Sequence, residues 1–141
     1  AELLARYWHR YDAGDVDGLA PLLTAEARFV TRTDTGTTDY EEFVRSDVTG
    51  RQAAVDWQRP HRADSPHPLR HCTTNVVADP DGPDAASFTS YLLVTQIQAG
   101  KPDPISTAVV EGRVVRTAGG LAFAHLEIVL DTADSVPFST R

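Results

Sequence analysis

The stretch Leu69–Asp79, LRHCTTNVVAD, decides the predicted fold, because its residues alternate as in a β-strand. Alternation places two sets of side chains on opposite faces: His71, Thr73, Asn75 and Val77 on one, and Cys72, Thr74, Val76 and Ala78 on the other. Hydrogen-bonding side chains four residues apart on one strand face indicate that this face lines a pocket or meets water. The second face is small and apolar, which is typical of packing. We therefore expect His71 and Asn75 to form the floor of a ligand cavity.

The rest of the C-terminal half is also strand-like. Turns rich in glycine and proline separate three further predicted strands: Ala85–Gln98, Ile105–Thr117 and Leu121–Asp131. The turns have the sequences DPDGP (79–83), AGKPDP (99–104) and AGG (118–120). Consecutive strands joined in this way pair antiparallel as hairpins. The last ten residues are expected to form a tail or an edge segment.

The N-terminal part predicts helices instead. Apolar and aromatic side chains recur at helical spacing over residues 2–13, at Leu3, Leu4, Tyr7, Trp8 and Tyr11. Asp12 falls on the edge of this apolar face, Gly14 is expected to end the helix, and Asp15 is a good cap for the next one. A short second helix is expected over Val16–Leu23, distorted by Pro21.

Between these helices and the long strands, the pattern changes several times. Ala27–Thr33 predicts a first strand, with its turn and return over Thr35–Thr38. Asp39 is a suitable cap for a helix over Tyr40–Ala54. Residues 57–68 contain three prolines and are expected to form a loop or the edge of a lid.

Helices first and hairpin-connected strands afterwards predict an α+β domain, with one curved antiparallel sheet and helices packed on one side. A sheet that curves around a helical cover leaves a cone-shaped hole, which suits a small apolar ligand. We expect one domain over residues 1–141, with its core over 2–131 and a tail over 132–141.

Composition excludes several classes of function. The 41% apolar and 23% charged content is ordinary for a globular protein, and the net charge of −7 argues against nucleic-acid or anionic-membrane partners. No apolar run approaches the roughly 20 residues that span a bilayer. A single cysteine rules out an internal disulfide and suits a reducing cytoplasm. The sequence lacks methionine, even at position 1, so we expect it to be trimmed and leave a removed leader open.

Three segments together carry a family resemblance: YWHRYDAGDVDGLAPLLTAEARF (7–29), the HxxxN motif (71–75) and VVRTAGGLAFAHLEIVLD (114–131). The chain resembles the SnoaL-like branch of the nuclear transport factor 2-like superfamily, over roughly residues 2–131. That branch includes scytalone dehydratase, bile-acid dehydratase and polyketide cyclase types. The resemblance implies a cone-shaped α+β barrel, no metal or organic cofactor, and a homodimer or homotrimer.

The resemblance also implies site residues. Dehydratase-like members place a tyrosine and an aspartate, five residues apart, opposite the histidine of an HxxxN strand. Tyr7 and Asp12 have that spacing here, and His71 and Asn75 match the strand motif. The family's last strand often carries a tryptophan and an arginine, which are replaced here by Leu121 and Leu126. His125 and Glu127 are the polar candidates that remain nearby.

An aspartate–histidine pair in an apolar cavity can transfer protons, because the carboxylate fixes the imidazole tautomer and favours its protonated form. We expect His71 to act as general base and acid with Asp12 as its partner, while Tyr7 or Asn75 donates a hydrogen bond to a developing enolate oxygen. Each residue also has a structural interpretation: a core histidine, a helix-terminal carboxylate, a packed tyrosine and a strand-end asparagine.

Other residues are weaker candidates for substrate contacts, metal binding or nucleophilic catalysis. Tyr11, Trp57 and His125 are the further candidates for substrate contacts, although an aromatic side chain at core spacing more often packs. His61, His67 and His71 lack the spacing of a metal site, and Cys72 points away from His71, so neither a metal centre nor a cysteine nucleophile is expected.

We therefore expect a cofactor-independent lyase or isomerase, of dehydratase or cyclase type, that acts on a hydrophobic polycyclic or polyketide-like molecule. A non-catalytic binder or an accessory subunit, like the beta subunits of ring-hydroxylating dioxygenases, is the alternative. Epoxide opening by Asp12 and Glu127 is a third hypothesis. Apolar side chains on the outer sheet face would support subunit packing; the candidates are Val94, Val110 and Leu126.

Overall fold

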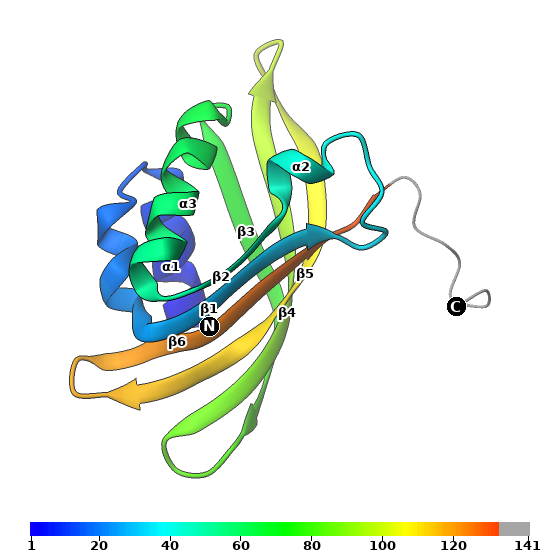
Figure 1. Cartoon of the computed structure of the whole chain (residues 1–141). Helices are drawn as coiled ribbons and strands as arrows, with labels where there is room; N and C mark the ends of the chain where they lie inside the picture. The colour runs from blue at the N-terminus through cyan, green and yellow to red at the C-terminus, as the bar shows by residue number, and fades with distance from the viewer. Residues whose placement is uncertain (133–141) are drawn as a thin grey trace.

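The computed structural model describes residues 1–132, which form three α-helices, one 3₁₀ helix and six strands (Figure 1). The elements, in chain order, are α1 (Glu2–Asp12), η1 (Asp17–Leu22), β1 (Leu23–Thr33), α2 (Glu41–Val44), β2 (Ser46–Thr49), α3 (Arg51–Asp64), β3 (Leu69–Pro80), β4 (Ala85–Gln98), β5 (Lys101–Thr117) and β6 (Gly120–Leu130). Most of the predicted tail, residues 133–141, lies outside the described residues.

The strands form one curved sheet with the order β2-β1-β6-β5-β4-β3, and helices α1 and α3 lie together on one side of it (Figure 1). The α+β prediction is therefore confirmed. One detail was wrong, because β1 and β6 run parallel while the other neighbours are antiparallel. The parallel pair arises because β6, the last strand, returns to the middle of the sheet beside the first one.

Helix α1 forms where its apolar spacing predicts. Its buried face consists of Leu4, Tyr7, Trp8, Tyr11 and Asp12. The large aromatic side chains contribute most, at roughly 1.5–3 kcal/mol each for full burial. The helix stops at the predicted point, since Gly14 has a φ of 77° and donates its backbone N–H to the carbonyl of Tyr11 at 2.9 Å.

The region from residue 35 to residue 68 differs from the prediction. The expected helix over Tyr40–Ala54 is wrong. Helix α2 ends at Val44, Ser46–Thr49 is extended and pairs with β1, and α3 begins only at Arg51. That strand, not Thr35–Thr38, is the return strand of β1. The expected loop over 57–68 is also wrong, because α3 continues through Pro60 to Asp64.

Helix α3 tolerates an internal proline because its packing outweighs the lost hydrogen bond. Its side chains Ala54, Val55, Gln58 and Arg62 are buried on both sides of Pro60. Two of these are polar, and each finds partners. The Gln58 amide donates to the Ala54 carbonyl at 3.0 Å, and Arg62 binds backbone carbonyls at the end of α1.

Strand β3 alternates as predicted only in its first half. Its pairing with β4 shifts between Thr74 and Val77, and Asn75 has a left-handed φ of 54°. This bulge breaks the period of two. The face of Cys72 and Thr74, predicted to pack, is exposed instead.

The predicted outer face of the sheet was assigned to the wrong residues. Val94, Val110 and Leu126 are buried on the inner face, under the helices. Alternation therefore turns their neighbours outward, and Tyr91 on β4 is 55% exposed. Within residues 1–132, no helix combines the length and the apolar character needed to cross a bilayer.

Candidate active site

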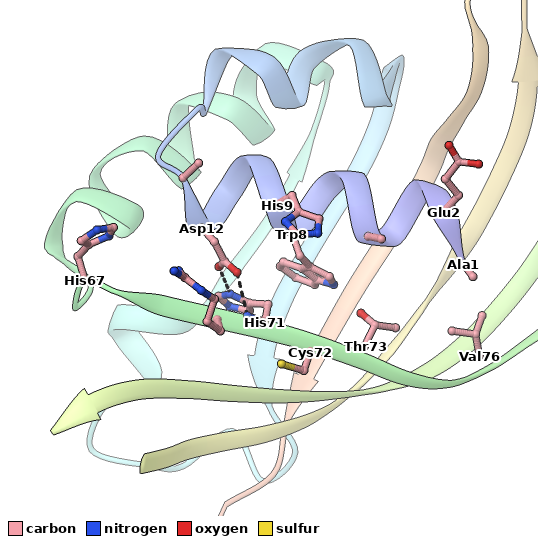
Figure 2. Close-up of a pocket in the computed structure, with 13 residues that line it drawn as sticks. Ala1, Glu2, Trp8, His9, Asp12, His67, His71, Cys72, Thr73 and Val76 are labelled. Carbon is pink, nitrogen blue, oxygen red and sulfur yellow. Dashed lines mark hydrogen bonds and ion pairs between the residues drawn. The ribbon is translucent and has the colours of Figure 1, made fainter. Parts of the chain in front are cut away.

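The end of α1 and the start of β3 bring Asp12 and His71 into direct contact (Figure 2). The Asp12 Oδ1 atom lies 2.5 Å from Nδ1 of His71, and Oδ2 accepts the backbone N–H of the same histidine at 2.9 Å. Both side chains are only 11% exposed. The carboxylate thus holds the backbone and the ring of His71 at once, and the predicted meeting of these two residues is confirmed.

Aromatic rings fix the orientation of the His71 imidazole. The Trp8 indole stacks on it, with ring centroids 4.6 Å apart and 8° between the planes. Tyr11 meets the same ring edge-on at 5.3 Å. Because Asp12 engages Nδ1, the other ring nitrogen, Nε2, is the one left for a ligand; no hydrogen bond to it occurs within residues 1–132.

A small, partly open cavity of about 80 Å³ lies between the helices and the sheet. Its polar lining comes from α1, α3, β1 and β3, through Tyr11, Gln58, His61, Thr31 and His71, and the Trp57 ring adds an apolar wall. The Tyr11 hydroxyl lies 2.7 Å from Nδ1 of His61. Tyr11 and Trp57 therefore stand in the cavity where the sequence predicted substrate contacts, and His61 joins them.

Electrostatics set the charge states of the Tyr11–His61 pair. Burial raises the pKa of Tyr11 to about 12, so its hydroxyl keeps its proton at neutral pH. Burial, with a smaller contribution from nearby His71, lowers the pKa of His61 below its ordinary value, so this ring is neutral. A neutral His61 that accepts from Tyr11 at Nδ1 carries its own proton on Nε2. His61 is then a hydrogen-bond donor.

The position of His61 is set by stacking on both α2 and α3. Its ring centroid lies 4.8 Å from that of Trp57, one turn earlier on α3, and 4.6 Å from that of Phe43 on α2. Sequence reasoning missed this histidine because Pro60 suggested a loop. The i, i+4 spacing of Trp57 and His61 was the available signal.

A second, larger hollow of about 870 Å³ lies between α1 and β3, on the other side of the same rings (Figure 2). Trp8 and His71 line both spaces, while Asp12, Thr73 and Val76 line only this larger groove. His71 therefore lines both the small cavity and the larger groove, while its partner Asp12 lines only the groove.

Tyr7 occupies a different place from the predicted one. Its side chain is completely buried, packs edge-on against Trp8 and Phe123, and donates its hydroxyl to Oε1 of Gln58. Burial raises its pKa. It lines neither hollow. The expectation that Tyr7 faces a substrate is thus wrong, because the helical spacing that places Tyr11 at the cavity turns Tyr7 into the core.

Asn75 and His125 also lie away from the site. The bulge exposes Asn75, whose Oδ1 accepts the hydroxyl of Thr74 at 2.8 Å, so it does not share a cavity floor with His71. His125 lies on the outer face of β6, with Nε2 3.7 Å from Oε2 of Glu127. Neither residue lines the cavity or the larger hollow.

Glu127 lies on the same outer face and pairs with Arg32, whose Nε is 3.2 Å from Oε1. Asp12 is on the inner side, so the two carboxylates cannot act on one epoxide. Residues 1–132 contain no group of three or more histidine, cysteine, aspartate or glutamate side chains placed to hold a metal ion. His67 instead lies 3.3 Å from the guanidinium of Arg62.

The fold is that of the nuclear transport factor 2-like, or cystatin-like, class. The chain belongs to the SnoaL-like domain family, whose model matches residues 1–127. A comparison with curated protein sequences gave no match.

Several solved structures share the fold. An NTF2-like protein with a cystatin-like fold from Novosphingobium aromaticivorans is 21% identical, with a TM-score of 0.69 over 96% of this chain and 80% of that one. A Catenulispora acidiphila protein in complex with S-DNPA is 24% identical, with a TM-score of 0.69 over 90% and 88%. A candidate scytalone dehydratase from N. aromaticivorans is 16% identical, with a TM-score of 0.71 over 96% and 85%. At these identities the likeness shows the fold alone.

Proposed function

We propose that this protein is a cofactor-independent lyase or isomerase, of dehydratase or cyclase type, that acts on a hydrophobic polyketide-like or polycyclic molecule. The observation that carries the proposal is the double contact of the Asp12 carboxylate with the ring and the backbone of His71. This contact fixes the tautomer with the proton on Nδ1 and leaves Nε2 as a base.

In a dehydration, Nε2 of His71 removes a proton from the carbon next to a carbonyl group, and the C–H electron pair forms an enolate. The enolate then expels a β-hydroxyl group, which takes the proton back from Nε2 and leaves as water. Asp12 stabilises the imidazolium that exists between the two steps. Such proton transfer is typically worth about 10²–10⁴-fold in rate.

The oxygen of the enolate needs a hydrogen-bond donor. The Nε2–H of His61 is the donor that the Tyr11–His61 bond orients, so we assign this role to His61 in place of Tyr7. A neutral imidazole serves well here, since it donates a hydrogen bond without an excess charge in the cavity.

Two of the similar structures support the proposal by analogy. The Catenulispora protein was solved in complex with S-DNPA, and the N. aromaticivorans protein is named as a candidate scytalone dehydratase. We further propose that the protein works as a homodimer or homotrimer in the cytoplasm, with the exposed outer sheet face around Tyr91 as a contact.

A second candidate function is that of a non-catalytic binder or accessory subunit. The small size of the cavity beside His71, about 80 Å³, favours the accessory subunit, because small-molecule sites usually measure about 300–1,000 Å³. For a polycyclic substrate, the body of the molecule would have to occupy the groove of about 870 Å³, or the cavity would have to widen.

The test compares His71→Asn with His125→Asn, a matched change on the outer sheet face. Purified variants are incubated with S-DNPA and with β-hydroxy carbonyl precursors of aromatic polyketides, and products are followed by mass spectrometry. We expect turnover to fall about 10²–10⁴-fold for His71→Asn only. Binding without turnover in the wild type would favour the binder, and equal turnover in both folded variants would overturn the assignment of His71.

A further inference from the structure

Arg62 is a buried cation that no part of the proposed chemistry uses. It lies on α3 directly after His61 and is 7% exposed. Buried arginines ordinarily pair with carboxylates. Within residues 1–132, Arg62 forms no such pair, and its guanidinium contacts three backbone carbonyl groups and Nδ1 of His67 instead.

Each contact of the guanidinium reaches a segment that carries a site residue. Its Nε donates to the Tyr11 carbonyl at 2.9 Å, and Nη2 donates to the Asp12 carbonyl at 2.8 Å. Its Nη1 donates to the carbonyl of Pro66 at 3.2 Å, in the connection that leads into β3. One side chain thus connects α3, the end of α1 and the start of β3.

The chemistry of the contacts suits arginine and no other residue. The two carbonyls at the end of α1 carry the negative end of the helix dipole, which a cation stabilises. A planar fork can donate along two parallel directions at once, whereas a lysine ammonium is a single point. The guanidinium also lies over the Tyr11 ring, with Cζ 5.9 Å from the ring centroid.

We infer that Arg62 is a positioning residue, which sets the register between α1 and β3 so that the Asp12 carboxylate reaches both the ring and the backbone N–H of His71. The inference rests on the proposed function for its catalytic consequence. The geometry of the Asp12–His71 contact can nevertheless be observed without any substrate.

The experiment uses Arg62→Lys, which keeps the charge and loses the fork, and Arg59→Lys as the matched control. Arg59 lies on the same helix, is exposed and pairs only with Asp17 at 2.6 Å. The first readout is the ¹H NMR signal of the Nδ1 proton of His71, which resonates far downfield when held in a short bond to Asp12. The signal is assigned by its loss in His71→Asn.

We expect this signal in the wild type and in Arg59→Lys, and its loss or upfield movement in a folded Arg62→Lys. On an identified substrate, kcat of Arg62→Lys should fall on the order of 10²-fold with KM changed less than about threefold, as for a misplaced catalytic group. A merely structural arginine would lower the melting temperature and leave both the signal and kcat unchanged, which would overturn the inference.

If Arg62→Lys does not fold, the inference is tested by hydrogen exchange in the wild-type protein. The Nε–H of Arg62 should exchange with solvent far more slowly than that of Arg59, because it is buried and donated to Tyr11. Equal exchange would overturn the inference. A changed His71 signal together with a wild type that turns over no substrate would refute the proposed function and leave the role of Arg62 intact.

Discussion

Residues 1–132 contain two histidine–carboxylate pairs, one on the inner side of the sheet and one on its outer face. Asp12 and His71 lie inside, 2.5 Å apart, with each side chain 11% exposed. Glu127 and His125 lie on the outer face of the sheet, 3.7 Å apart, with side chains 22% and 34% exposed, and Glu127 is shared with Arg32. Similar groups therefore form a close, oriented contact in one place and a loose, partly exposed one in the other.

The comparison shows that an imidazole ring has a fixed orientation only when contacts hold it from several sides. The inner imidazole has a stacked ring on its face, an edge-on ring at its side and a carboxylate on Nδ1, so its Nε2 points in one direction. The outer imidazole has one distant partner. A general base must be held in a fixed orientation toward the proton that it removes, and the contacts of the inner imidazole fix its orientation while those of the outer one do not.

Substituting each of the two carboxylates in turn should give the largest difference in the free energy of unfolding. Asp12→Ala leaves the backbone N–H and Nδ1 of His71 without their partner, and we expect it to lower the free energy of unfolding by about 3 kcal/mol. Glu127→Ala should cost less than about 1 kcal/mol, because its partners remain hydrated. Urea denaturation followed by circular dichroism measures both, and equal losses would erase the distinction between the pairs.

The two tyrosines of α1 provide a second comparison, between a core residue, Tyr7, and a cavity residue, Tyr11. Tyr7→Phe leaves Oε1 of Gln58 buried without its donor, so we expect a loss of about 1–2 kcal/mol in stability and little change in turnover. Tyr11→Phe removes the hydroxyl that orients His61, so turnover should fall by about tenfold or more while the aromatic packing stays. Paired denaturation and rate measurements test this, and a reversed pattern would restore Tyr7 to the site.

The pH dependence of stability provides a smaller effect. Because burial lowers the pKa of His61 in the folded state, the unfolded chain binds a proton to this residue at higher pH than the folded chain does. Stability contributed by neutral His61 is therefore complete above its ordinary pKa of 6.5 and decreases as pH falls below that value. Melting temperatures between pH 7.5 and 5 should decline less steeply in His61→Gln than in the wild type. An identical decline in both would show that His61 does not titrate as a buried group.

The sequence predicted the inner pair because the necessary information is local. Helical spacing puts Asp12 at the edge of a buried face, a strand starts near His71, and the family resemblance relates the two. His61 was missed because a proline normally interrupts a helix, and the tertiary packing of α3, which outweighs the lost hydrogen bond, cannot be seen in the sequence. The orientation of His125 depends on which face of β6 meets the helices, and its strand pattern is compatible with either face.

The smallest predicted effect concerns Asn75, on the strand that carries His71. Its left-handed φ of 54° is a conformation that asparagine tolerates and glycine adopts freely, and its side chain contacts only the Thr74 hydroxyl. Asn75→Gly should therefore change stability by less than about 1 kcal/mol and leave turnover at the wild-type level. Asn75→Val is the informative companion, since a β-branched residue opposes this φ and should straighten the bulge or destabilise the strand. A loss of turnover in Asn75→Gly at unchanged stability would mean that this amide reaches the ligand after all, and that the exposed half of β3 belongs with the inner pair.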